Sequence, residues 1–157
     1  MRRRSDAPVT PVEVRRTAMD LLANREHSTA ELRRKLTGRG FDSALVEDAL
    51  AGLARDGLLS DRRFAEEYIS YRAQKGFGPV RIRAELHERG IGSELIGELL
   101  DPQDQRWWQL AQSAHRKRFG EALPRDIHER AKQARFLQQR GFTAEQIRRV
   151  LRHDDWE

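Results

Sequence analysis

One short frame recurs three times along the chain, and it limits the fold more than any other feature of the sequence. In each copy a helical segment ends in Arg-Gly-Phe or Arg-Gly-Ile, with the glycines at Gly40, Gly90 and Gly141, and a second helical segment follows. The copies align without gaps at an offset of about 50 residues, a period expected of small helical modules. A glycine at a helix end can adopt the left-handed conformation that closes the helix, and the Phe or Ile after it fills the corner. The frame therefore predicts an array of helical units.

Each frame is preceded by another helical segment, at residues 12–24, 61–75 and 104–119, so that each unit has three helices. Ser28-Thr-Ala-Glu31 and Thr143-Ala-Glu-Gln146 have the capping-box pattern of a helix start. Asp42 and Ser93 are expected to cap two of the third helices. No alternating run of strand-forming residues is present. These patterns predict an all-α fold of three tandem three-helix (helix-turn-helix-like) repeats in an elongated, curved array. The expected boundaries are a mobile basic tail at 1–10 and repeats at 11–58, 59–101 and 102–157.

The composition favours thin helical cores and leaves the partner open. Hydrophobic residues make up 38% of the chain and charged residues 35%, too little apolar surface for one thick core. The net charge of +5 permits contact with nucleic acid or with an acidic protein surface. Cysteine is absent, which fits a reducing compartment, and no run approaches the roughly 20 apolar residues of a membrane span. No apolar segment follows Arg2–Arg4, so no secretory signal is expected. We therefore expect a cytoplasmic protein, a monomer, with no membrane contact.

Patterns that carry catalysis, cofactor binding or metal binding are missing from the chain. The five histidines are far apart and form no His-x-x-x-His pair, so each is expected at the surface. No Gly-x-x-x-x-Gly-Lys-Ser/Thr phosphate loop occurs. Gly76-Phe-Gly78 joins two helical segments and has no strand before it, so it is interpreted as a corner rather than as part of a dinucleotide site. The sequence predicts no enzyme activity, no catalytic residue, no cofactor and no metal site.

Positive charge is concentrated in the second helix of each repeat. The third helices of the first two repeats are acidic, which argues against the usual helix-turn-helix role, because phosphates would repel a recognition helix of that charge. If stacking aligns the second helices, their cations form a broken basic stripe suited to a nucleic-acid backbone or to an acidic protein groove. The last third helix is basic instead. The predicted partner-binding residues are Arg33, Arg34, Lys35, Arg81, Arg83, Arg130, Lys132, Arg135, Arg148, Arg149 and Arg152.

The aromatic residues are predicted to serve mainly the core. Phe64 and Tyr68 lie one helical turn apart, which places them on one apolar face. Trp107 and Trp108 are adjacent and cannot both face the same core, so one is expected to be packed and the other partly exposed, where it becomes an interface candidate.

Residues 58–91 carry a long pattern that resembles the RecX family of bacterial recombination regulators. The matching residues are Leu58-Leu59-Ser60-Asp61-x-x-Phe64-Ala65-x-x-Tyr68-Ile69-x-x-Arg72, then Gly76-Phe77-Gly78-Pro79-x-x-Ile82-x-x-x-Leu86-x-x-Arg89-Gly90-Ile91. The resemblance implies a protein that binds the RecA recombinase, mainly its filament on single-stranded DNA. It implies modulation, mainly inhibition, of ATP hydrolysis, strand exchange and stimulated repressor autocleavage in DNA repair and the SOS response. It implies no catalytic residues.

Two other interpretations remain open at this point. One is a helix-turn-helix-type DNA-binding protein that acts on bare DNA, which predicts steep salt dependence. The other is a helical scaffold, or a partner of some other acidic protein.

Overall fold

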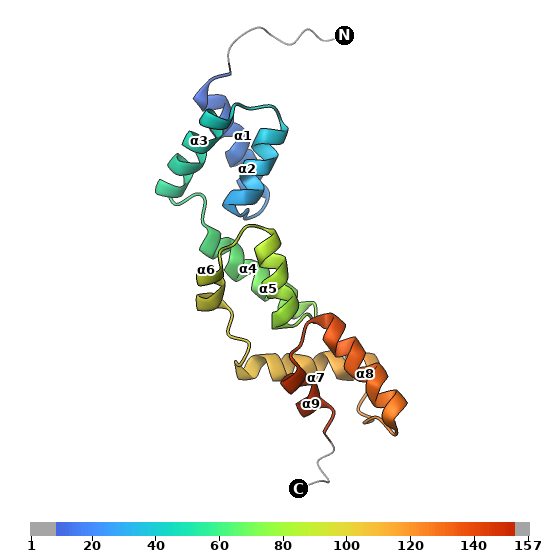
Figure 1. Ribbon diagram of the computed structural model, residues 1–157. Coiled ribbons are helices and arrows are strands. Elements are labelled where there is room, and N and C mark those ends of the chain that lie inside the picture. Colours follow the sequence, from blue (N-terminus) through green and yellow to red (C-terminus); the bar gives the residue numbers. More distant parts are fainter. Residues whose placement is uncertain (1–8, 153–157) are drawn as a thin grey trace, which may run out of the picture. The chain divides into compact units, whose positions relative to one another are not determined.

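The computed structural model describes residues 9–152, and within them the chain forms nine helices and no strand (Figure 1). This confirms the predicted all-α fold. The expected tail at residues 1–10 lies outside the described residues except for Val9 and Thr10. The helices are α1 (Pro11–Asn24), α2 (Thr29–Gly38), α3 (Ser43–Arg55), α4 (Asp61–Gln74), α5 (Pro79–Glu88), α6 (Ser93–Leu99), α7 (Gln105–Phe119), α8 (Ile127–Arg140) and α9 (Ala144–Val150).

The chain divides into two compact units, and the first contains α1, α2 and α3. This first unit runs through Phe64 and also takes in Arg89–Ile91. Its three helices pack pairwise against one another and lie side by side in Figure 1. Each helix buries one apolar stripe, and a buried aliphatic side chain contributes about 1.5–3 kcal/mol to folding. The core consists of Val14, Ala18, Leu32, Leu36, Val46, Leu50, Leu53 and Leu59.

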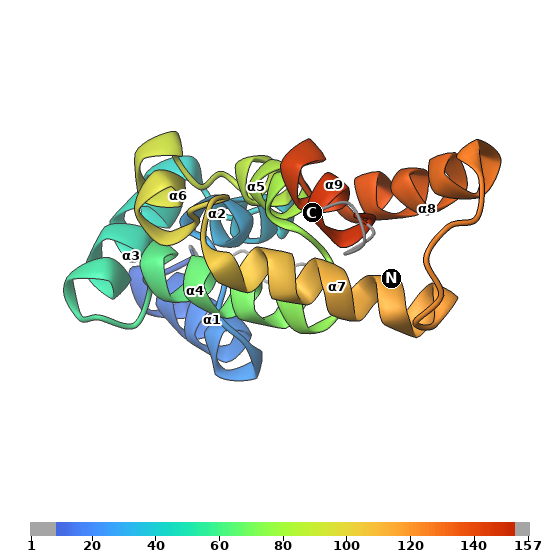
Figure 2. The ribbon, with the colours of Figure 1, turned by 90° about the horizontal axis from the view of Figure 1, so that it is seen from below.

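The second unit contains α4 beyond its first turn and the helices α5 to α9. Within it α7, α8 and α9 pack pairwise, with α7 running along α8 and α9 in Figure 2, and α5 packs on α6. Hydrophobic side chains from these helices form the core. The largest are Ile82, Leu86, Ile96, Leu100, Trp107, Leu137, Phe142, Ile147 and Leu151.

The helix ends follow the predicted capping patterns except at the starts of α3 and α6. Gly40, Gly90 and Gly141 have φ values of 91°, 81° and 99°, the left-handed conformation expected for glycines that close helices. The capping boxes at the starts of α2 and α9 are both formed. The prediction for Ser93 was wrong, because the extended residue before α6 is Gly92, and Ser93 is already helical. Asp42 does occupy the N-cap of α3, but its side chain makes no capping hydrogen bond.

The end of α8 meets the start of α5 inside the second unit (Figure 1). The backbone N–H of Gly78 donates to the carbonyl of Arg140 at 2.7 Å, and the N–H of Val80 donates to the carbonyl of Gly141 at 2.8 Å. The first N–H groups of a helix and the last carbonyls of another lack partners within their own helices, so each end satisfies the other. The negative end of one helix dipole also faces the positive end of the next.

The first unit contains a junction of the same kind at the start of α2. The hydroxyl of Ser28 donates to the carbonyl of Arg89 at 2.6 Å, and Gly90 lies against the side chain of Ala30. The glycine of one frame thus approaches the first turn of a second helix in each unit.

Polar residues of the third repeat are buried in hydrogen-bonded pairs. Gln133 is 3% exposed, and its side-chain oxygen accepts a hydrogen bond from Nε2 of His115 at 2.7 Å. Gln146 is 7% exposed, and its amide donates to the carbonyl of Pro102 at 2.7 Å. The prediction that every histidine lies at the surface was wrong for His115 and also for His27, because each finds a partner inside its unit.

Candidate partner-binding surface

Two of the predicted binding cations in the first unit are engaged by neighbouring side chains. Arg33 donates through Nε and Nη2 to both carboxylate oxygens of Glu47, at 2.5 and 3.2 Å. These hydrogen bonds lower the pKa of Glu47 and raise the pKa of Arg33. Lys35 donates to Nε2 of His27 at 2.8 Å. Both cations are exposed, but each already interacts with a side chain of the first unit.

Two predicted cations of the second unit bind backbone carbonyls. Arg81 donates to the carbonyl of Gln139 at 3.1 Å, and Arg130 donates to the carbonyl of Leu151 at 3.0 Å. Both acceptors lie near the C-terminal ends of helices, where carbonyls are left without helical partners. These arginines therefore stabilise the fold, in addition to any contact that they make with a partner.

Arg149 covers the partly exposed tryptophan of the second unit. Its guanidinium carbon lies 3.9 Å from the ring centre of Trp108, and its Nη1 donates to Gln105 at 3.3 Å. Trp107 is 3% exposed and packs in the core, while Trp108 is half-buried. The prediction that one tryptophan is packed and the other partly exposed is confirmed, but Arg149 occupies a face of the exposed ring.

The remaining six predicted cations are exposed and make no hydrogen bond or ion pair within residues 9–152. We call them the open cations. Because nothing in the described chain neutralises them, they are free to meet an acidic or phosphate-bearing partner. They are Arg34, Arg83, Lys132, Arg135, Arg148 and Arg152.

The Gly-Phe-Gly-Pro corner between α4 and α5 is built from arginines stacked on Phe77. Guanidinium carbons of Arg72, Arg81 and Arg140 lie 3.7, 4.5 and 4.8 Å from the ring centre. Arg72 also donates twice to the carboxylate of Glu85, at 2.9 Å each. The corner predicted from the sequence is confirmed, and its arginines serve the fold.

A basic pocket lies in the second unit between the end of α4, α7 and α8. Its cavity volume is about 240 Å³, and sequence patterns did not select it. The available signal was the basic run His115-Arg-Lys-Arg118, which lies in a first helix rather than in a second helix. We call this cavity the α7 pocket. Its cations are Lys75, Lys117, Arg118 and Arg140, and its apolar lining includes Leu110, Ala114 and Phe136.

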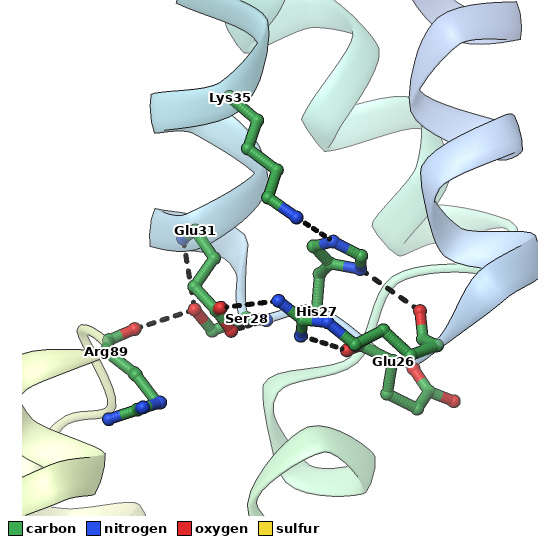
Figure 3. A network of polar contacts seen from close by, with 7 residues as sticks. Glu26, His27, Ser28, Glu31, Lys35 and Arg89 are labelled. Atoms are coloured by element: carbon green, nitrogen blue, oxygen red, sulfur yellow. Dashed lines mark hydrogen bonds and ion pairs between the residues drawn. The ribbon is translucent and has the colours of Figure 1, made fainter.

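His27 is the centre of a buried polar network at the start of α2 (Figure 3). Lys35 can only donate, so Nε2 of His27 must accept, and Nδ1 carries the proton that it donates to the carbonyl of Arg25 at 3.0 Å. Burial is the main cause that lowers the pKa of His27 from its ordinary value, and the nearby charges of Arg25 and Lys35 lower it further. The fold therefore holds a neutral histidine with a defined tautomer.

The first unit is expected to lose stability as the pH falls below about 6.5, the ordinary pKa of histidine, because the unfolded chain then binds a proton that folded His27 resists. The slope reaches at most about 1.4 kcal/mol per pH unit for one group. The pH dependence of the free energy of unfolding is measured by urea denaturation between pH 7.5 and 5.0, with circular dichroism as the signal. His27→Gln should flatten this dependence, whereas replacing the exposed His87 should leave it intact. An unchanged slope in His27→Gln would assign the effect to another group.

Within residues 9–152, no three histidine, aspartate or glutamate side chains gather as a metal site would require. No helix in the same part of the chain is both long enough and apolar enough to cross a membrane.

Fold and surface together define the class of protein. It is an all-α protein of three-helix repeats with exposed cations that have no partner within residues 9–152. Comparison with protein families assigns each three-helix repeat in turn. RecX domains match as the first three-helix domain over residues 15–53, the second over 60–100 and the third over 104–151. The chain belongs to the RecX family of regulatory proteins, which confirms the resemblance drawn from residues 58–91.

Relatives support this assignment over nearly the whole chain. Regulatory protein RecX of Pseudomonas savastanoi pv. phaseolicola is 48% identical over 142 residues, which is 90% of this chain and 92% of the relative. The RecX protein of Pseudomonas fluorescens is 49% identical over the same shares. The crystal structure of RecX from Lactobacillus salivarius has a TM-score of 0.77 at 17% identity, covering 89% of this chain and 93% of that one. At that identity the structure supports the fold alone.

Proposed function

We propose that this protein is a cytoplasmic, monomeric regulator that binds the RecA recombinase and its filament on single-stranded DNA. Binding modulates, and mainly inhibits, ATP hydrolysis, strand exchange and coprotease activity in DNA repair and the SOS response. Membership in a family of regulatory proteins supports the regulatory role. The observation that carries the proposed contact is the set of open cations, which have no partner within residues 9–152.

The open cations suit a long, polar and reversible interface. Arg83 lies on α5, and Lys132 and Arg135 lie on α8, so two second helices in the second unit supply three of the six open cations. Lys132 and Arg135 are three residues apart and share a helix face. Each exposed cation alone contributes little, but several contacts made along neighbouring filament subunits add through effective concentration. Such an interface can be tight and still be released.

Reversing two open cations should weaken inhibition strongly. The variant Arg83→Glu/Arg135→Glu places two repelling charges at the proposed contact, and we expect the concentration for half-inhibition of the recombinase ATPase to rise at least about tenfold. The measurement is ATP hydrolysis by the recombinase on single-stranded DNA with increasing regulator. Both residues are exposed and unpaired within the described chain, so the fold should be retained.

The matched control is Arg16→Glu/Arg125→Glu, which makes the same change of charge at exposed positions outside the predicted surface. It should inhibit as the parent protein does. Equal inhibition by the two double variants would refute the placement of the contact on α5 and α8. No inhibition by the parent protein itself, at stoichiometric excess, would refute the proposed function.

A second candidate, binding to bare DNA, is favoured by the basic charge of α9. Arg148 lies in this helix and Arg152 just beyond it, and the second helix of a helix-turn-helix pair is the one that enters the major groove. This candidate predicts binding to duplex DNA that falls steeply as salt rises and that Arg148→Glu abolishes. Tight filament binding with no such duplex binding rejects it.

A further inference from the structure

The α7 pocket combines positive charge at its mouth with an apolar lining. Lys75, Lys117 and Arg118 are exposed, whereas Leu110 and Phe136 are half-buried and Ala114 is buried. At about 240 Å³ the cavity is smaller than the roughly 300–1,000 Å³ of small-molecule sites. Its size suits one or two side chains of a partner rather than a cofactor.

The cations of the pocket have no carboxylate partner among residues 9–152. Within these residues the one hydrogen bond that Arg140 donates goes to the backbone carbonyl of Lys75, at 3.4 Å. The Nζ atom of Lys75 lies 5.5 Å from the ring centre of Tyr71. For Lys117 the described chain offers no partner at all. Four like charges around one hollow repel each other, so an acidic ligand would relieve that repulsion as well as gain its own contacts.

The lining favours a peptide over a nucleic acid. A base that enters a site commonly stacks on an aromatic face. Among residues 9–152, the only aromatic side chain that lines the cavity is Phe136, which packs edge-on with Phe119 and has the guanidinium carbon of Arg140 5.2 Å from its ring centre. The rest of the apolar lining is aliphatic, which matches a leucine-sized side chain.

We propose that the α7 pocket receives an aliphatic side chain flanked by carboxylates, from an acidic segment of a partner protein. The aliphatic group lies against Leu110 and Ala114, and the carboxylates pair with Lys117 and Arg118 on the exposed side of α7. The identity of the partner as the recombinase rests on the function proposed above. The chemistry of the pocket is independent of that function. The site is lined by α7, the end of α4 and α8, and none of its four cations is an open cation.

The test titrates the isotopically labelled full chain with a synthetic peptide of sequence Glu-Asp-Leu-Asp-Glu and follows backbone amide chemical shifts. We expect shifts at Leu110, Ala114 and Phe136 and none around Arg34 of the first unit. A peptide with serine in place of leucine should bind more weakly. Lys117→Glu/Arg118→Glu should weaken binding at least about fivefold, because two attractive charges become repulsive. Ser113→Glu, which adds a negative charge to the lining without removing a cation, provides a second variant if the first fails to fold.

Arg16→Glu/Arg125→Glu again serves as the control of equal charge and should bind the peptide as the parent does. Absence of shifts at the pocket at millimolar peptide overturns the proposal. So do shifts of the same amides at lower concentrations of oligothymidylate, which would make the pocket a nucleic-acid site. Peptide binding at the pocket with no effect of the protein on the recombinase would refute only the proposed function.

Discussion

Replacing Gly141 by alanine is expected to lower the free energy of unfolding of the second unit by about 3 kcal/mol or more, from backbone strain and overpacking together. Gly141 has a φ of 99°, which an alanine adopts only with strain. An added Cβ would also lie 2.6 Å from the backbone nitrogen of Arg81 and still closer to its Cβ, so the end of α8 would have to move from the start of α5. That movement breaks the hydrogen bonds from Gly78 and Val80.

The repeat supplies its own control for this prediction. Gly40 occupies the same position in the first frame with a φ of 91°, but nothing lies within 4 Å of its added Cβ. Gly40→Ala should therefore cost only the backbone strain, about 1 kcal/mol. Urea denaturation measures both: fluorescence of Trp107 and Trp108 reports the second unit, and circular dichroism reports the helices of both units. Equal losses in the two variants would show that the contact with Arg81 adds nothing.

The contrast among the frame glycines explains how far the sequence could predict the fold. The Arg-Gly-Phe/Ile pattern and the two capping boxes predicted the helix ends, because those conformations depend on residues a few positions apart. The same pattern could not distinguish Gly40 from Gly141. What separates them is whether the start of another helix lies against the glycine, and that contact joins residues far apart in the sequence. The predicted domain boundaries and the curvature of the array stay predictions.

The candidate surface was harder to predict than the fold, for a related reason. Composition and helix assignment selected basic second helices, but they could not show that Arg33 is neutralised by Glu47 or that Arg130 binds the carbonyl of Leu151. Charge on a helix becomes available to a partner only when the fold leaves it unpaired. The α7 pocket was missed because its cations come from the turn after α4, from α7 and from α8, and the basic run in α7 gave no sign that the other two segments lie beside it.

Loss of Arg72 is expected to destabilise the second unit by about 2 kcal/mol, because its charge is partnered in a half-buried place. The side chains of Arg72 and Glu85 are only 18% and 17% exposed. Arg72→Ala removes the two hydrogen bonds that Arg72 donates to the Glu85 carboxylate, and it removes the guanidinium 3.7 Å from the centre of the Phe77 ring. Arg72→Lys keeps the charge but loses the planar, two-pronged contact, so it should recover only part of the stability.

A double-mutant cycle separates the ion pair from the stacking. With Arg72→Ala, Glu85→Ala and the double variant, we expect a coupling free energy of about 1–2 kcal/mol, because either single variant removes both hydrogen bonds between Arg72 and Glu85. Arg72→Met serves as the matched control, since it keeps an apolar chain over Phe77 and should differ from Arg72→Ala mainly by the stacking contribution. Purely additive losses would mean that water, or another side chain, satisfies Glu85 when Arg72 is gone. In that case the arginine would act at the corner through Phe77 alone, and Arg72→Met would retain nearly full stability.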